Sequence, residues 1–212
     1  MVDEIGRIEK PEAQNFVAKR KVYVVPLIFR GKDAPLEYVA KAGVYWSQVK
    51  EHIAKLEDRI GKTQHIYHET ISTAGEEGLK ILEKLNPDVC EISREKCAAG
   101  AVLEAAEDKG LVDECLDWER FILLGFISEA VAEKVSQLYM EAVKKRYDYF
   151  LKNIEQTLKP GEAGLVFIQE GNWLQFPRDV EVFSVTPPAL DEINRWLRDK
   201  SQEKQQNAPQ EQ

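Results

Sequence analysis

A nearly continuous apolar run near the start of the chain reads Lys21-Val-Tyr-Val-Val-Pro-Leu-Ile-Phe29 and is rich in β-branched residues. Such a run is typical of a strand covered on both faces, as in α/β proteins. Pro26 cannot donate a hydrogen bond to a neighbouring strand, so we expect this strand either to lie at a sheet edge or to end early. A turn, Arg30-Gly-Lys-Asp-Ala-Pro35, follows it.

The next segment carries the clearest helical periodicity in the chain. Apolar residues recur at alternating spacings of three and four, at Val39, Ala42, Trp46, Val49, Ile53, Leu56 and Ile60. The spacing predicts a helix over about residues 39–60 with one apolar seam. Residues 64–71 form a second strand candidate, and a helix ending at Asn86-Pro87 follows. Because both faces of the second strand mix polar and apolar side chains, we expect it not to be central in the sheet.

The rest of the chain predicts a helical middle and a return to strands. Residues 92–108, 112–124 and 127–158 carry helical apolar stripes, and the last segment contains no proline or glycine. Residues 165–170 and 173–176 flank Gly171-Asn172, a signal for a β-hairpin. A strand over 180–185 and a helix after Pro188 complete the pattern. We therefore predict an α/β (α+β) fold: a small mixed sheet with parallel N-terminal strands and a C-terminal hairpin, flanked by long helices and a helical insertion.

The expected organisation is one domain with two polar ends. Residues 1–20 are interpreted as a polar arm, 21–199 as a single α/β domain with a helical subdomain at about 88–158, and 200–212 as a disordered tail. The tail has almost no apolar side chain whose burial could offset the entropy of ordering.

Composition indicates a soluble, cytoplasmic protein. No stretch approaches 18 uninterrupted apolar residues, so no membrane span is expected, and the first ten residues lack the apolar core of a secretory signal. Cys90, Cys97 and Cys115 match no zinc pattern and are interpreted as reduced thiols.

Acidic residues are concentrated in one segment of a chain whose formal net charge is −8. Residues 101–133 hold nine acidic residues against Lys109 and Arg120, a net charge of −7. This concentration argues against nucleic-acid binding there, since phosphates would be repelled. The favoured interpretation is a solvated helical surface, and the alternative is a docking site for a basic protein partner.

A homodimer is predicted from the lengths of the two main helices. At 1.5 Å per residue, a helix over 127–158 would be about 48 Å long and one over 39–60 about 33 Å long. If they pack lengthwise, the longer helix overhangs with apolar side chains, Phe150 among them. Covering such a surface by twofold pairing is common, so we place the long helix at or near a dimer interface.

Candidate site residues cluster at the ends of the first two strands. In open α/β sheets, ligands bind outside the carboxyl ends of parallel strands. Those ends supply Arg30, Lys32 and Thr70 as candidate ligand-binding residues and His68 and Glu69 as candidate catalytic residues. The alternative is that these are ordinary turn and strand-end residues.

A metal site and a nucleotide site are not expected. His65 and His68 would share a metal on a helix, but on a strand they point to opposite faces. The sequence contains no G-x-G-x-x-G and no P-loop motif, so no cofactor is predicted.

No motif identifies a reaction, so the sequence leaves open whether this protein is an enzyme. Two functions are compatible with the pattern. The favoured one is a non-enzymatic interaction or adaptor protein that uses long amphipathic helices and an acidic surface. The alternative is a small α/β enzyme or anionic-ligand-binding protein with a site at the carboxyl ends of the first two strands.

Overall fold

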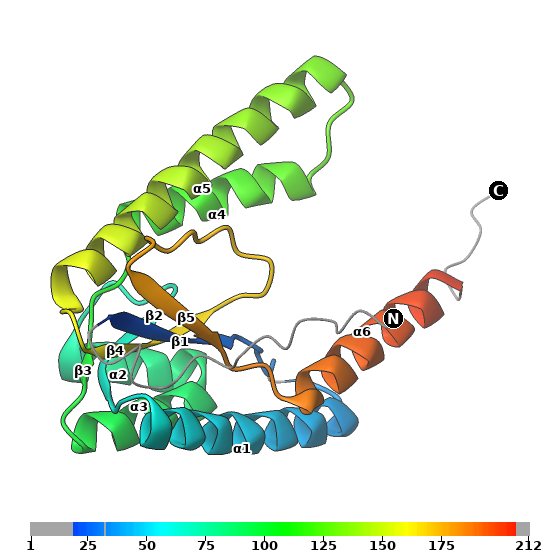
Figure 1. Ribbon diagram of the computed structural model, residues 1–212. Helices are drawn as coiled ribbons and strands as arrows, with labels where there is room; N and C mark the ends of the chain where they lie inside the picture. The colour runs from blue at the N-terminus through cyan, green and yellow to red at the C-terminus, as the bar shows by residue number, and fades with distance from the viewer. Residues whose placement is uncertain (1–18, 32, 207–212) are drawn as a thin grey trace, which may run out of the picture.

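The computed structural model describes residues 19–31 and 33–206, and its centre is a five-stranded parallel sheet with the order β3-β2-β4-β1-β5 (Figure 1). Its elements in chain order are β1 (Arg20–Pro26), α1 (Leu36–Arg59), β2 (Thr63–His68), α2 (Gly75–Leu85), α3 (Pro87–Ala98), β3 (Val102–Leu103), α4 (Lys109–Leu123), α5 (Glu129–Thr157), β4 (Ala163–Ile168), β5 (Val180–Ser184) and α6 (Pro188–Gln206). The predicted α/β class is confirmed.

The first apolar run forms β1, an interior strand between β4 and β5. Val22, Tyr23 and Val25 are fully buried, which accounts for the nearly continuous apolar sequence. Pro26 is the last residue of the strand, so the missing hydrogen-bond donor falls where the ladder ends. The strand therefore ends early at Pro26 and does not lie at an edge of the sheet.

The predicted C-terminal hairpin is wrong, because β4 lies between β2 and β1 and has no free edge for a hairpin partner. The turn at Gly171-Asn172 does form: the Asn172 side-chain amide donates to the Gln169 carbonyl oxygen over 2.8 Å, and its oxygen accepts from the Leu174 N–H over 3.2 Å. The chain then crosses back as an irregular segment, without a strand over 173–176, and β5 joins β1 in parallel.

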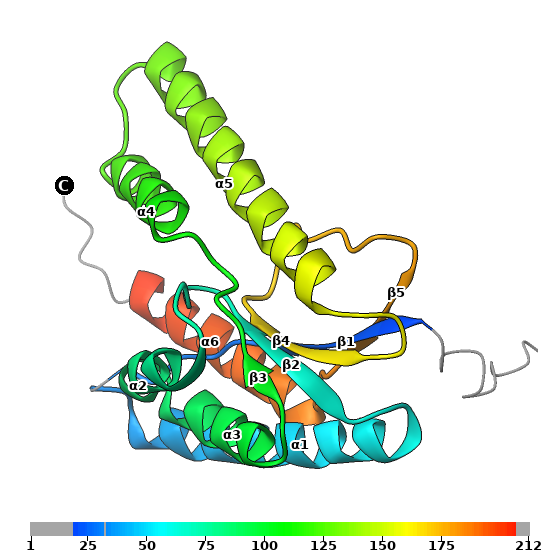
Figure 2. The same ribbon diagram turned by 90° about the vertical axis from the view of Figure 1, so that its left-hand side faces the viewer.

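Helices cover both faces of the sheet (Figure 2). On one face, α1, α2, α3 and α6 share a core with the inward side chains of β1, β2 and β4. On the other face, Phe150, Ile154 and Leu158 at the end of α5 pack with Val22 and Val166. The helix predicted over 39–60 is α1, and its seam residues Trp46, Val49 and Ile53 are buried.

The lengthwise packing of the two main helices is not observed, because the sheet separates α1 from α5 (Figures 1 and 2). Instead, α5 pairs with α4 in a helical hairpin that projects from the sheet. A small cluster of Cys115, Ala142 and Val143 holds the base of this hairpin together.

Three further expectations are corrected by the structure. The helix expected over 92–108 ends at Ala98, and Gly100 adopts a left-handed φ of 106° before β3 begins. Because β3 pairs with β2, the second strand is an interior strand with β4 on its other side. At the C-terminus, α6 continues past Asp199 to Gln206, so the helix enters the range expected to be disordered. The predictions for residues 1–18 and 207–212 lie outside the described residues.

None of the helices in the described part of the chain combines the length and apolar character needed to cross a bilayer.

Candidate functional site

Of the residues proposed at the end of the first strand, Arg30 is not a free cation. Arg30 makes an ion pair with Asp88 in the first turn of α3. Lys32 lies outside the described residues. Thr70 follows β2 with a left-handed φ of 76°, and its backbone N–H donates to Glu107 Oε1 over 3.5 Å. Arg30 and Thr70 therefore engage different groups.

The two candidate catalytic residues, His68 and Glu69, have different surroundings. The His68 ring lies 6.1 Å from the ring of Phe167, within the core beneath α1, and is completely buried. Its Nδ1 donates to the Glu69 backbone oxygen, while its Nε2 has no partner among the described residues. Burial lowers the pKa of His68 to about 4, so this imidazole is neutral at physiological pH.

His65 occupies the opposite face of β2, where its ring stacks with Tyr67 at 6.2 Å. Its Nδ1 lies 2.7 Å from Glu104 and its Nε2 3.3 Å from Glu162. The two histidines therefore do not face one another, as the strand interpretation implies. Within residues 19–31 and 33–206, no group of three or more His, Cys, Asp and Glu side chains is arranged to hold a metal ion.

A buried acidic cluster forms where β2 ends, and Glu69 is part of it. Glu107 accepts from Arg146 Nε over 2.9 Å and from Nη2 over 2.6 Å, and its side chain is completely buried. Glu69 accepts from the Gln169 backbone N–H and is electrostatically coupled to Arg146 and Glu107. We call Glu69, Glu107 and Arg146 the carboxylate cluster.

The carboxylate cluster has one cation for two carboxyl groups. Burial raises the pKa of Glu69 to about 7, against the opposing effects of the Gln169 N–H and the Arg146 charge. Glu69 Oε1 and Glu107 Oε2 are buried and have no hydrogen-bond partner among the described residues. Glu69 therefore gains or loses its proton near neutral pH, at the position where ligands of parallel sheets usually bind.

The prediction that Glu104, Glu107 and Asp108 lie on a solvated helix face is wrong. They belong to the connection after β3, because the preceding helix ends at Ala98. Glu104 contacts His65, Glu107 is buried against Arg146, and Asp108 caps α4 by accepting from the Leu111 N–H over 3.0 Å.

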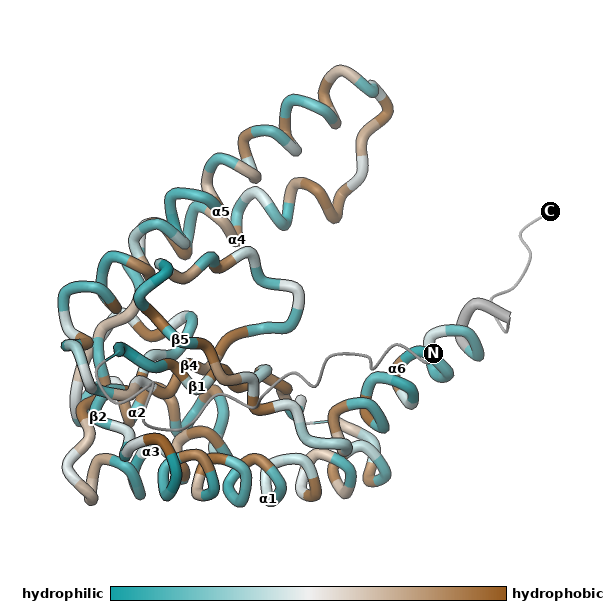
Figure 3. The backbone as a smooth tube through the Cα atoms, viewed as in Figure 1, coloured by the Kyte–Doolittle hydropathy of each residue, from teal (hydrophilic) through white to brown (hydrophobic). Residues whose placement is uncertain are grey.

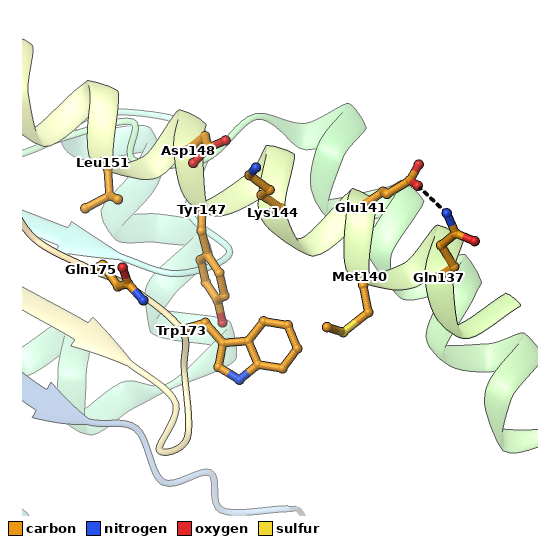
Figure 4. Close-up of a pocket in the computed structure, with 9 residues that line it drawn as sticks. All are labelled: Gln137, Met140, Glu141, Lys144, Tyr147, Asp148, Leu151, Trp173 and Gln175. Atoms are coloured by element: carbon orange, nitrogen blue, oxygen red, sulfur yellow. Dashed lines mark hydrogen bonds between the residues drawn. The ribbon is translucent and has the colours of Figure 1, made fainter. Parts of the chain in front are cut away.

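A pocket of about 620 Å³ opens beside this cluster, between α5 and the segment after β4 (Figure 4). Tyr147, Met140 and Leu151 of α5 face Trp173 and Gln175 across it. A smaller cavity of about 170 Å³ adjoins it and shares Tyr147 and Trp173. We call the two together the α5 pocket. Glu69 raises the pKa of Tyr147 in addition to the effect of burial, so the carboxylate cluster acts directly on the pocket wall.

The second candidate surface is the projecting end of the α4–α5 hairpin. None of residues 116–141 is buried. At the connection between the helices, large apolar side chains face solvent, with Leu123 85% and Leu124 79% exposed and Ile127 fully exposed. Figure 3 shows hydrophobic positions, in brown, along this connection. Together with the exposed Phe121 and Ile122, these residues are called the apolar tip.

Comparison of this chain with protein-family models, with curated proteins and with solved structures finds no match. Its function is therefore argued from the geometry.

Sequence reasoning missed Arg146, Tyr147 and Trp173. Arg146 carried a usable signal, because it lies four residues from both Ala142 and Phe150 and therefore falls on the buried side of α5. A charged residue in an apolar stripe predicts a buried ionic partner. Trp173 carried no comparable signal, because its position depends on the irregular course of residues 169–179.

Proposed function

We propose that this protein is a non-enzymatic interaction or adaptor protein, and that the α4–α5 hairpin is its docking element. The exposure of the apolar tip is the observation that carries the proposal. Leu123, Leu124 and Ile127 contribute nothing to the three cores of the domain, so folding does not account for them. Large contiguous apolar surfaces on soluble chains commonly mark interaction sites.

The charge around the tip defines the kind of partner. Asp117, Glu119, Glu129 and Glu133 flank the tip, against Arg120 and Lys134. We therefore propose a protein partner with an apolar surface bordered by basic side chains. Apolar contacts would supply affinity, and the charges would speed encounter and exclude acidic competitors.

A homodimer through α5 is the second candidate. Val131 and Leu138 lie seven residues apart on the same side of α5, and both are exposed. A self-complementary contact of this side would bury these residues without bringing two acidic tips together.

We also propose that the protein acts in the cytoplasm. The free thiols of Cys90, Cys97 and Cys115 support a reducing compartment. Because Cys90 and Cys115 are buried, the test is alkylation of cells lysed directly in denaturant, which should label all three cysteines. Disulfide-protected cysteines would argue for an oxidising location.

A defined peptide pair tests the docking proposal. The probes are an amphipathic helical peptide of leucine and lysine and its counterpart of leucine and glutamate, with binding followed by fluorescence anisotropy. The lysine peptide should bind more tightly, and its affinity should fall with added salt. The double substitution Leu123→Ser and Leu124→Ser should abolish this binding. Leu36→Ser is the matched control, because Leu36 is 88% exposed on α1, outside the hairpin.

Three results would contradict these proposals. Equal binding of the two peptides would contradict the proposal of a basic partner. Binding that survives in the Leu123→Ser, Leu124→Ser variant would contradict the proposal that the apolar tip is the docking element. A wild-type protein that sediments as a monomer at tens of micromolar would contradict the proposal of a homodimer.

A further inference from the structure

The α5 pocket is built from one face of a helix and an ordered turn. Tyr139, Val143 and Tyr147 recur every four residues along α5 and line the smaller cavity. Trp173 closes it from the other side, with 54% of its surface exposed. Tyr147 and Trp173 both line this cavity, and Figure 4 shows the hydroxyl end of Tyr147 directed towards the side of the pocket that carries Trp173. Three of the eight residues that line this cavity are therefore aromatic.

The turn that carries Trp173 is fixed before any ligand arrives. Gly171 has a φ of 74°, a left-handed conformation that glycine adopts without strain. The Asn172 side chain bonds to the Gln169 oxygen and the Leu174 N–H, as described above. The Gln169 N–H in turn donates to Glu69. This arrangement ties the aromatic wall to the carboxylate cluster and lowers the entropic cost of binding.

The electrostatic environment of the pocket is acidic. The charges of Glu69 and Glu107 raise the pKa of Tyr147, Glu119 accepts from the Tyr139 hydroxyl over 3.1 Å, and Glu170 lines the smaller cavity. Arg146 is committed to Glu107, and the amine of Lys144 points away from Trp173 in Figure 4. The next regular element after β4 is the strand β5, not a helix. The carboxyl end of β4 therefore lacks the following helix N-terminus that would favour an anion.

We propose that the α5 pocket binds a small organic cation, an alkylammonium compound, with its charged group against the indole of Trp173 and beside Tyr147. Aromatic rings attract ammonium groups through their quadrupole, and quaternary ammonium groups are recognised by aromatic cages of this kind. The nearby carboxylates supply the net negative charge. The site is separate from the apolar tip and is independent of the docking proposal.

The ionisation of Glu69 couples this binding to pH. The groups that face Glu69 are Arg146 and Tyr147 of α5, Glu107 before α4, Glu119 of α4 and the backbone of Gln169. A bound cation favours the ionised carboxyl, so affinity should rise several-fold between pH 6 and pH 8 as Glu69 loses its proton. Glu69→Gln should remove most of this pH dependence while leaving binding measurable.

The test uses choline and its uncharged isostere, 3,3-dimethylbutan-1-ol, on the full chain. Binding is measured by calorimetry and by the NMR shift of the Trp173 indole. Choline should bind at least about fivefold more tightly than the isostere, as expected for a cation–π contact. Trp173→Leu should abolish the difference, and Trp173→Phe should restore part of it. Trp196→Leu is the matched control, because Trp196 lies on α6, packs against the core on the other face of the sheet and lines neither cavity.

Several outcomes would overturn the proposal. These are equal binding of choline and its isostere, no detectable binding of choline, or binding that Trp173→Leu leaves unchanged. A peptide containing trimethyllysine carries the same chemistry on a protein chain. If it binds more tightly than choline, the assignment to a small molecule is wrong.

Discussion

Two neighbouring residues of this protein respond to pH in opposite directions. His68 has a pKa lowered to about 4 by burial, and Glu69 has a pKa raised to about 7, also by burial. In both cases the interior disfavours the charged form. As the pH falls, His68 in the unfolded chain binds its proton at a higher pH than His68 in the folded chain. The free energy of unfolding therefore decreases as the pH drops from about 6.5 towards 4. As the pH rises, Glu69 in the folded chain loses its proton at a higher pH than Glu69 in the unfolded chain. The free energy of unfolding therefore decreases as the pH rises from about 4.5 to 7.

Glu69→Gln should therefore stabilise the protein in alkaline but not in acidic solution. At pH 8 the substitution removes a buried, incompletely paired charge, and we expect a gain on the order of 2 kcal/mol. At pH 5 the native carboxyl is already neutral, so the gain should be small. Urea unfolding of both proteins at the two pH values measures this difference. Equal effects at pH 5 and pH 8 would show that Glu69 does not titrate in this range.

Arg146→Met should be among the most damaging single substitutions. It leaves Glu107 buried without its only ion-pair partner in the described part of the chain, and we expect a loss of about 3–5 kcal/mol. Adding Glu107→Gln should recover much of that loss, because the unpaired charge is removed. A double-mutant cycle from denaturant unfolding gives the coupling free energy. Additive effects of the two substitutions would contradict the pairing.

At the scale of elements, the two halves of α5 have different roles. Its C-terminal half packs on the sheet, with Phe150 and Ile154 buried beside Tyr67 and Val166. Its N-terminal half leaves the sheet and pairs with α4, and near the middle of the helix Tyr139 and Met140 line the pocket opposite Trp173 (Figure 2). The apolar stripe is continuous along the whole helix, so the sequence alone does not indicate where burial ends.

This division changes the expected result of one substitution. If the overhanging side of the long helix were a dimer interface, Phe150→Asp would give a folded monomer. The buried position of Phe150 instead predicts unfolding, as the buried position of Val49 in α1 does for Val49→Asp. Leu124→Asp at the apolar tip should leave the fold intact, because Leu124 faces solvent. Circular dichroism melting curves distinguish the three. A folded Phe150→Asp variant would mean that the packing of α5 on the sheet is wrong.

At the scale of the whole molecule, the distal hairpin is separable from the domain. Because none of residues 116–141 is buried, replacing residues 121–131 with a short Gly-Ser linker should shift the melting temperature by only a few degrees. Differential scanning calorimetry of the shortened chain measures the shift. A large fall would show that the tip stabilises the domain, and the argument for a docking role would lose its basis.

The individual elements could be predicted because their signals are local. The strand at 21–29, the seam of α1 and the long α5 depend on side-chain spacing within one segment, and each is found close to its predicted range. The sites were predicted less well. Glu69 was proposed as a catalytic candidate from its place at the end of a strand, and that role stays a prediction. Its structural partners Glu107 and Arg146 were not proposed.

The amino-acid sequence by itself determined the α/β class, the identity of most elements and the burial of their apolar faces, because these follow from short-range periodicity. Only the tertiary structure decided the insertion of β4 between β2 and β1, which excludes a hairpin and makes every strand parallel. It also decided the pairing of Glu107 with Arg146, 39 residues apart in the chain. Both depend on contacts between distant segments, whose relative placement is set by the packing of the whole domain and leaves no periodic trace in either segment.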